Sequence, residues 1–280
     1  MPKVYSRALT IAGSDSGGGA GIQADLKTFT VLGVYGSSVI TALTAQNTCE
    51  VRSILSVPSK FIVNQIDVVL QDIGADAIKI GMLHRKNVIE AVARRLRSHQ
   101  KIPIVLDPVM IAKSGDVLLK KDAIQCLKNK LLPLAKIMTP NLPETEILLG
   151  RSIRSQNEVE EAARDLLKLG PEVVVLKGGH ALGTWSADCV ATRNQKCFLW
   201  LRTKRIQTKN THGTGCTFSA AIAAYLAKGL EPIDAIKKAK TLISNAIQSG
   251  APYKLGHGHG PVNHLAVKKG DLSPTGPRPP

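Results

Sequence analysis

The feature that most constrains the fold is an alternation, along the whole chain, of short apolar β-rich runs with segments of helical periodicity. The expected strands are residues 8–12, 38–42, 77–80, 104–106, 137–139 and 173–177. The expected helices are residues 22–32, 60–72, 86–99, 120–131, 158–169, 218–228 and 232–249. This alternation is typical of βαβ units, in which helices cover both faces of a parallel sheet. We therefore predict an α/β fold, a three-layer α/β/α sandwich with a central, mostly parallel sheet.

Three segments refine this prediction. Residues 104–106 and 173–176 are continuously apolar, as central parallel strands should be. Residues 188–206, with Trp200 and alternating apolar positions, are expected to form a small β-hairpin at the sheet edge. The last thirteen residues hold four prolines. We expect one folded domain over residues 1–267 and a disordered, basic, proline-rich tail over residues 268–280.

Composition sets the broad class of protein. A chain of 280 residues with 44% hydrophobic content can bury a large core. It has no apolar run of about 18 residues and no signal peptide, so we expect no membrane association and no secretory route. The five cysteines show neither CxxC pairing nor zinc spacing. Scattered free thiols fit a reducing environment, which makes a cytoplasmic protein the expectation.

The formal charge of +16 raises the question of a nucleic-acid partner. Most lysines and arginines fall on expected helices, where they form solvated faces. Aromatic residues make up only 4% of the chain, too few for a platform on which single-stranded bases would stack. We therefore expect no nucleic-acid partner, although the excess charge could steer phosphorylated small molecules toward the protein.

Residues 210–217 form the most informative turn in the sequence. They join an expected β-like run, residues 205–208, to the helix expected at residues 218–228. Two glycines before a helix leave backbone N–H groups free, and with the helix dipole these groups make an anion site. Cys216 feels the same field, which is expected to lower its pKa. An anion hole beside a base suits phosphoryl transfer to a hydroxyl. A plain glycine-rich turn with a small buried cysteine is the alternative.

A second glycine-rich turn follows the first expected strand. Residues 19–24 fit a GxGxxA dinucleotide pattern, but the first acidic residue after Asp25 is Glu50, well past the place of a ribose-binding carboxylate. A Walker A loop is excluded because no Gly-Lys-Ser/Thr occurs in the chain. We expect the glycines to let the backbone approach a flat ligand, with Asp25 as a polar handle. A plain tight turn is the alternative.

Other polar residues follow the expected strands. Gln46 can both donate and accept, so it can pair with an aminopyrimidine edge, and Met82 would be a pliable apolar wall for a ring. Asp107, Asn141 and Glu144 could organise magnesium and phosphates, although Glu144 could equally be a charge at a helix N-terminus. Because the carboxyl ends of parallel strands meet at one edge of a sheet, we expect all these residues to form one site.

Two further segments are assigned to the nucleotide. Lys177 ends an apolar strand, where its ammonium group could neutralise phosphates. Residues 256–261 contain His257 and His259 at i and i+2 among glycines. A metal site would need more ligands than these two histidines. We therefore favour a glycine-rich loop that closes over the nucleotide.

The motifs together resemble a known family, the hydroxymethylpyrimidine and phosphomethylpyrimidine kinases of thiamine synthesis. The resemblance covers roughly residues 7 to 265, in family order. It implies a ribokinase-like fold, ATP with Mg²⁺, and a homodimer. It also implies phosphorylation of 4-amino-5-hydroxymethyl-2-methylpyrimidine and then of its monophosphate, giving the diphosphate. The matching motifs are residues 12–28, 41–48, 79–83, 106–110, 139–144 and 210–217.

The resemblance also implies roles for single residues. Cys216 is assigned as the base, with the backbone of Gly213, Thr214 and Gly215 around the transferring phosphoryl group. The pyrimidine pocket is assigned to Gly13, Ala20, Asp25, Thr44, Gln46, Met82 and Val109. The nucleotide site is assigned to Asn141, Lys177, Gly178, Gly179, His180, Thr208 and Gly258. The metal ligands are assigned to Asp107 and Glu144.

Sugar kinases of the superfamily generally have Asp at the position of Cys216, whereas the vitamin-kinase branch has Cys, as this chain does. Three features depart from the family: Thr44 stands where an apolar pocket residue is expected, the hairpin around residues 199–202 is unusually apolar and basic, and the proline-rich tail has no counterpart. Two rival functions remain. The rival within the superfamily is a pyridoxal or pyridoxine kinase, and Gln46 is the feature that favours the pyrimidine. A non-catalytic ligand sensor or nucleic-acid-binding protein is the rival from another class, suggested by the charge of +16.

Overall fold

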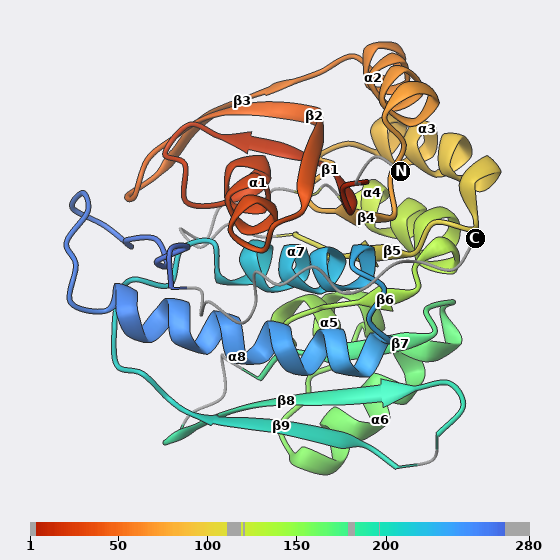
Figure 1. The fold of residues 1–280 in the computed structure, drawn as a ribbon. Coiled ribbons are helices and arrows are strands. Elements are labelled where there is room, and N and C mark those ends of the chain that lie inside the picture. Colours follow the sequence, from red (N-terminus) through yellow and green to blue (C-terminus); the bar gives the residue numbers. More distant parts are fainter. Residues whose placement is uncertain (1–3, 111–118, 120, 179–182, 196, 267–280) are drawn as a thin grey trace.

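The computed structural model describes residues 4–110, 119, 121–178, 183–195 and 197–266 (Figure 1). These residues build one sheet with the strand order β3-β2-β1-β4-β5-β6-β7-β8-β9. The run from β2 to β7 is parallel throughout. The pairs β2–β3, β7–β8 and β8–β9 are antiparallel. The strands are β1 (Arg7–Asp15), β2 (Tyr35–Gln46), β3 (Val51–Ser56), β4 (Ala77–Ile80), β5 (Ile104–Leu106), β6 (Ile137–Met138), β7 (Val173–Leu176), β8 (Trp185–Thr192) and β9 (Leu199–Lys204).

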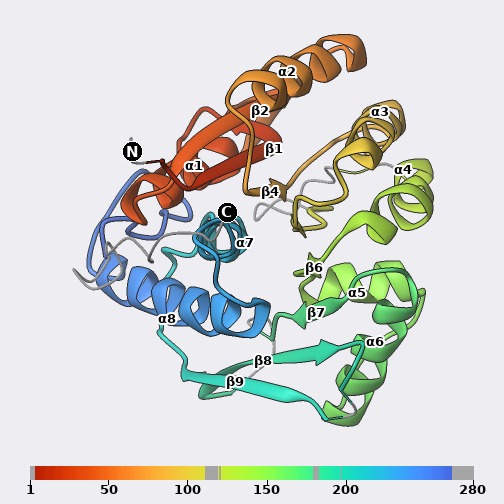
Figure 2. The same ribbon diagram turned by 45° about the vertical axis from the view of Figure 1, so that its right-hand side comes forward.

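Helices cover both faces of this sheet. In Figure 2, α7 and α8 lie to the left of the strands, and α3, α4, α5 and α6 lie to the right. The three-layer α/β/α sandwich with a mostly parallel sheet is thereby confirmed. The helices are α1 (Gly21–Val31), α2 (Ser59–Asp72), α3 (Lys86–Leu96), α4 (Lys121–Cys126), α5 (Leu142–Leu149), α6 (Gln156–Lys168), α7 (Thr214–Ala227) and α8 (Pro232–Gly250).

Each face of the sheet has its own hydrophobic core, because successive side chains of a strand point to opposite faces. On β4, Ile78 and Ile80 belong to the core that also holds α2, α3 and α6, whereas Ala77 belongs to the core with α7 and α8. Nearly all of α7 is buried, and its small alanines let it lie close to the strands. This close packing places the N-terminus of α7 at the carboxyl edge of the sheet.

The structure corrects several expected elements. The edge hairpin is confirmed, but it spans Trp185–Thr192 and Leu199–Lys204, so residues 205–208 are a loop and not a strand. The helix expected at 120–131 turns from α to π geometry at Leu127–Leu131. Strand β3 and helix α5 were not expected, because β3 lacks a clear apolar alternation and α5 is only eight residues long.

Candidate active site

A cavity of about 590 Å³ opens at the carboxyl edge of the parallel strands, beside the N-terminus of α7. This is the edge where ligands of such sheets bind, and the volume lies within the usual range for ligand pockets. Most of the residues that the sequence singled out line this one cavity, as expected. They are Gly13, Ala20, Thr44, Gln46, Met82, Asp107, Val109, Asn141, Glu144, Lys177, Gly213, Thr214, Gly215 and Cys216.

The N-terminus of α7 lacks a side-chain cap within the described structure. The N-cap residue is Gly213, so no side chain can accept the first amide hydrogens of the helix. By contrast, α5 and α6 each begin with a capping box, at Asn141 and Ser155. The Thr214 amide donates to the Thr211 carbonyl, and residues 213–216 line the cavity at the positive end of the α7 dipole, a position that suits an anion.

The two glycine-rich turns meet at Gly213. This residue has a φ of 77°, and a Cβ atom there would lie 1.8 Å from the carbonyl oxygen of Gly19. Glycine is therefore required both by the left-handed conformation and by the close approach of the two backbones. The contact brings the first turn directly against the anion site.

An Asp15–His212 pair fastens the same two turns. The carboxylate of Asp15 accepts hydrogen bonds from the amides of Gly17 and Ala20, and His212 Nε2 lies 2.8 Å from Asp15 Oδ2. Burial acts to raise the pKa of Asp15, but the bonds from His212 and the loop amides outweigh it and lower that pKa. His212 also donates its backbone N–H to the carbonyl of Gly260. Three distant segments are thus joined at the rim of the cavity.

One part of the cavity suits a flat polar ring. Met82 and Val109 pack with the buried Ala42 in a small apolar cluster, which forms one wall. Thr44 Oγ1 donates to the carbonyl oxygen of Ser14 and lies 3.1 Å from Gln46 Oε1. The single hydroxyl proton can go to only one of these two oxygens, and Thr44 is therefore a polar lining residue beside the Gln46 amide.

A charged cluster lies between the anion site and β5. Lys177 Nζ donates to Asp107 Oδ1 at 2.8 Å, and Thr139 Oγ1 donates to the same oxygen at 3.2 Å. Burial acts to lower the pKa of Lys177, but Asp107 and Glu144 outweigh it and raise that pKa, so the ammonium form is favoured. A Cβ atom on Gly215 would lie 3.3 Å from Lys177 Nζ, which places this cluster against the first turn of α7.

Glu144 has a structural role that the sequence left open. It forms a capping box with Asn141: Asn141 Oδ1 accepts from the Glu144 amide, and Glu144 Oε2 accepts from the Asn141 amide. Burial raises the pKa of Glu144 to about 7. Asn141 and Glu144 both line the cavity as well. The capping box therefore holds their side chains at the cavity rim.

The oxygen ligands in this region fit a magnesium ion. Asp107 and Glu144 are both nearly fully buried carboxylates that line the same cavity. Within the described residues, no group of three or more His, Cys, Asp and Glu side chains could hold a metal ion. Phosphate oxygens and water would therefore have to complete the coordination, which is the usual way in which magnesium is bound beside nucleotides.

Cys216 lines the cavity as expected, but the expected direction of its pKa shift is wrong. Burial raises the pKa of the Cys216 thiol to about 11. Lys79 acts in the opposite direction, whereas the carboxylates of Asp25 and Asp107 add to the rise. The helix field is thus outweighed by the loss of water around the sulfur.

Asp25 is also placed differently from the expectation. It is fully buried and is not among the described residues that line the cavity, so its assignment to the pyrimidine pocket is wrong. Its Oδ2 accepts from Thr10 Oγ1 at 2.6 Å and from Lys79 Nζ at 2.8 Å. Asp25 therefore lies one layer beneath the cavity, where it contacts a lysine that does line it.

Parts of the expected nucleotide site lie elsewhere. Gly258 donates its N–H to Thr48 Oγ1 and packs on the turn between β2 and β3, away from the described cavity lining. Thr208 accepts from the Asn210 amide, and Gly178 donates to Asp188; neither is among the described lining residues. Gly179 and His180 lie outside the described residues. The expectation that residues 256–261 close over the nucleotide is therefore wrong for Gly258.

The cavity has lining residues that the sequence did not identify. Lys79 could have been noticed as the one charged residue in the apolar strand β4. His212 gave no signal, because its partner Asp15 is 197 residues away in sequence. The end of the hairpin and helix α8 add a further wall, formed by Ser186, Lys204, Arg205, Ile206, Ser244 and Ile247.

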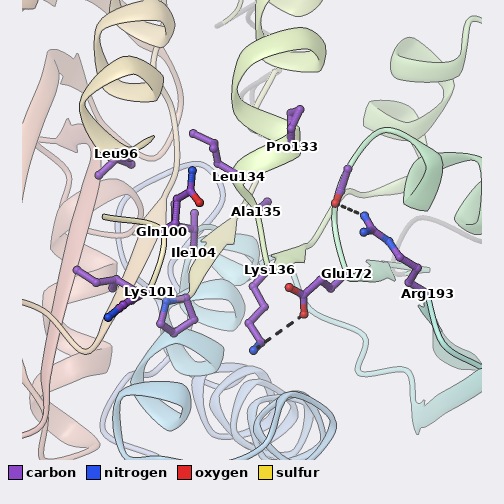
Figure 3. Close-up of a pocket in the computed structure, with 13 residues that line it drawn as sticks. Leu96, Gln100, Lys101, Ile104, Pro133, Leu134, Ala135, Lys136, Glu172 and Arg193 are labelled. Carbon is purple, nitrogen blue, oxygen red and sulfur yellow. Dashed lines mark hydrogen bonds and ion pairs between the residues drawn. The ribbon is translucent and has the colours of Figure 1, made fainter. Parts of the chain in front are cut away.

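A second hollow, of about 380 Å³, lies at the opposite edge of the sheet (Figure 3). Its lining includes Lys136 and Glu172, which precede β6 and β7, and Arg193, which follows β8. Arg193 donates to the carbonyl oxygen of Gly170, and Lys136 Nζ lies 4.0 Å from Glu172 Oε2. These basic side chains are already paired at the amino ends of the strands. The hollow is therefore not the candidate site.

Comparisons with known proteins agree with this geometry. A family model described as phosphomethylpyrimidine kinase matches residues 15–263. The chain is 51% identical to a thiamine biosynthesis bifunctional protein of Geobacter sulfurreducens over 92% of its own length, but it spans only 52% of that relative. It is 48% identical to the hydroxymethylpyrimidine/phosphomethylpyrimidine kinase of Escherichia coli, covering 92% of this chain and 97% of the relative.

A solved structure is similar over almost the full chain. The ADP complex of Bacillus subtilis pyridoxal kinase superposes with a TM-score of 0.87 and 38% sequence identity, covering 94% of this chain and 98% of that one. Within the described residues, no helix combines the length and apolar character needed to cross a membrane.

Proposed function

The chain belongs to the phosphomethylpyrimidine kinase family, and from that premise we propose that it transfers the γ-phosphoryl group of ATP to 4-amino-5-hydroxymethyl-2-methylpyrimidine and then to its monophosphate. The observation that carries the proposal is one cavity that holds an uncapped helix N-terminus, a thiol and an amide-bearing ring pocket. Gln46, which lines the cavity beside Thr44, can pair with the aminopyrimidine edge. Met82 and Val109 form the apolar wall for the ring.

Transfer itself requires little covalent chemistry from the protein. The substrate hydroxyl loses its proton to Cys216 as its oxygen bonds to the γ-phosphorus, and the bond from that phosphorus to the bridging oxygen of ADP breaks. The amides of residues 213–216 stabilise the charge on the equatorial oxygens. Lys177 neutralises phosphate charge. A magnesium ion held by Asp107 and Glu144 would supply further neutralisation of the phosphates.

The expected test of this function is direct product analysis. The pure protein with Mg·ATP and the hydroxymethyl pyrimidine should give the monophosphate, then the diphosphate, with one ADP per phosphate transferred. A reaction without pyrimidine is the control and should release little ADP. A strong preference for pyridoxal in a parallel assay would favour the superfamily rival. Absence of ATP turnover with either alcohol would favour a non-catalytic protein.

The pyridoxal rival has one observation in its favour, the 0.87 TM-score to Bacillus subtilis pyridoxal kinase. The relatives at 48% to 51% identity are instead named for pyrimidine phosphorylation or thiamine biosynthesis. Gln46 in the ring pocket supports the pyrimidine as the preferred alcohol. The ADP complex of the pyridoxal kinase also supports ATP as the phosphoryl donor here.

The raised pKa of Cys216 predicts a specific pH dependence. A base must be deprotonated, and the thiol pKa is about 11, so the thiolate fraction should rise about tenfold per pH unit below that value. We expect kcat/KM for the pyrimidine, which reports the ionisation of the free enzyme, to rise from pH 8 to pH 10, a window above the Glu144 pKa of about 7. Initial rates at saturating ATP and subsaturating pyrimidine measure this. A flat profile in that window would contradict proton acceptance by the thiol.

Three further expectations remain proposals. Leu43 and Leu55 are Cα partners in the β2–β3 pairing, and both are exposed, which supports the homodimer as a way to cover them. Free cysteines throughout the chain support a reducing, cytoplasmic environment. The single sheet formed by the described residues supports one kinase domain over residues 1–267, and the tail at 268–280 lies outside the described residues.

A further inference from the structure

A buried ion pair includes a lysine that lines the same cavity as the candidate base. Lys79 is on β4, and its side chain is fully buried, as is that of Asp25 on α1. Lys79 Nζ lies 2.8 Å from Asp25 Oδ2. Lys79 shares a face of β4 with Ala77, which belongs to the core beneath α7. The lysine also lines the active-site cavity, as does Cys216.

Stability alone does not account for this pair. Replacing a buried ion pair by well-packed apolar residues is often neutral or stabilising, because both charges lose their hydration. Here Asp25 Oδ1 is buried without a hydrogen-bond partner within the described structure, which adds to the cost. Room for the ammonium group also depends on Gly81, since a Cβ atom there would lie 2.8 Å from Lys79 Nζ. A leucine or methionine at position 79 would pack as well as the lysine does. Packing therefore does not explain the buried ion pair.

The pair acts electrostatically on the thiol. Burial has the largest effect on the pKa of Cys216 and raises it, and Lys79 has the next largest effect, in the opposite direction. Asp25 opposes Lys79, because a carboxylate disfavours a nearby anion. Burial acts to lower the pKa of Lys79, but Asp25 outweighs it and raises that pKa, so the lysine stays charged inside the protein.

We propose that Lys79 and Asp25 are positioning residues that set how often Cys216 is a thiolate: the Lys79 ammonium stabilises the anionic sulfur, and the Asp25 carboxylate holds Lys79 charged and limits its effect. The two side chains act through Cys216 and have no part in bond making themselves. This inference deepens the proposed function and rests on it for its catalytic meaning. Its electrostatic content, however, can be measured without any substrate.

The test is the alkylation rate of Cys216 by iodoacetamide in the full-length, substrate-free protein, followed by peptide mass spectrometry from pH 7 to pH 11. The thiolate is the reacting species, so the rate reports its population. Lys79→Met should slow the reaction at pH 8 by about tenfold or more, the equivalent of one pKa unit. Lys79→Arg, which keeps the charge, should stay closest to the wild type.

The exposed Cys49 in each sample serves as an internal reference, and its rate should not change. Structural damage at position 79 would slow both Lys79→Met and Lys79→Arg, so slowing in Lys79→Met alone is the signature of the proposal. The double variant Lys79→Met, Asp25→Asn leaves no buried charge unpaired. It should react more slowly than the wild type but faster than Lys79→Met, and it carries the test if a single variant does not fold.

Equal Cys216 rates in the wild type and in folded Lys79→Met or double-variant protein would overturn the proposal, as would equal slowing in Lys79→Met and Lys79→Arg. A second readout is the pH dependence of kcat/KM for the pyrimidine, whose rise should move to higher pH in Lys79→Met while KM for ATP is unchanged. If alkylation shifts as expected but the wild type does not phosphorylate the pyrimidine, the proposed function fails and the electrostatic pair stands. If the wild type phosphorylates the pyrimidine but the alkylation rate does not shift, the electrostatic role of Lys79 and Asp25 is rejected and the proposed function stands.

Discussion

Replacing Cys216 with alanine is expected to lower kcat by roughly two orders of magnitude or more, the usual contribution of a positioned proton acceptor. The substitution removes the sulfur but leaves the amides of α7 and the Asp107–Lys177 cluster in place. Binding of both substrates should therefore persist. Because the loss falls on the transition state, kcat and kcat/KM should decrease together.

Steady-state kinetics with both substrates varied would measure this effect. Cys49→Ala is the matched control, since Cys49 is exposed and is not among the described residues that line the cavity. It should behave as the wild type. The residual rate of Cys216→Ala should also lose the rise between pH 8 and pH 10. A Cys216→Ala enzyme with a near-wild-type kcat would show that the thiol does not accept the proton.

Gly213→Ala is expected to reduce activity by at least about a hundredfold, comparable to losing a donor to the developing charge. The new methyl group would lie 1.8 Å from the carbonyl oxygen of Gly19, a backbone atom that cannot rotate away as a side chain could. The two turns would have to separate, which shifts the first amides of α7. The left-handed conformation, with a φ of 77°, adds about 1 kcal/mol of strain for alanine.

Gly229→Ala separates the backbone strain from the contact with Gly19. Gly229 lies just after the C-terminal end of α7. Gly229 has a φ of 86°, but a Cβ atom there would meet no atom of the described structure within 4 Å. This variant should lose a little thermal stability and keep its activity. The thermal unfolding temperatures and the kcat values of Gly213→Ala and Gly229→Ala would measure the difference. If both glycine variants lost activity equally, strain alone would explain the result and the close contact with Gly19 would have no special role.

The βαβ alternation was sufficient to predict the layers and the edge at which the site forms. Each central strand carries its own signal, such as the fully buried run of β7. The same rule predicted that Gln46, Met82 and Asp107 would meet, because carboxyl ends of parallel strands share an edge. Elements whose burial depends on neighbours distant in sequence, such as β3, gave no comparable signal.

Electrostatics was harder to predict than position. The helix start at Cys216 has a local signature, and that signature predicts a lower thiol pKa. The opposing effect comes from burial, and burial depends on how β4 and α1 pack around the sulfur. Asp25 was misassigned for the same reason, since only the fold reveals that its partner is Lys79 and not a ligand. A single sequence reports local fields well and desolvation poorly.

The Asp15–His212 contact also bears on when this protein becomes competent during its synthesis. Its two partners are 197 positions apart, and the backbone of His212 is paired in turn with Gly260 and Val262. Long-range closures of this kind form late, because the intervening chain must first be ordered. A ribosome-bound fragment that holds the first six strands would thus have most of its sheet but no closed rim. Ligand capture should begin only once almost the entire polypeptide has emerged.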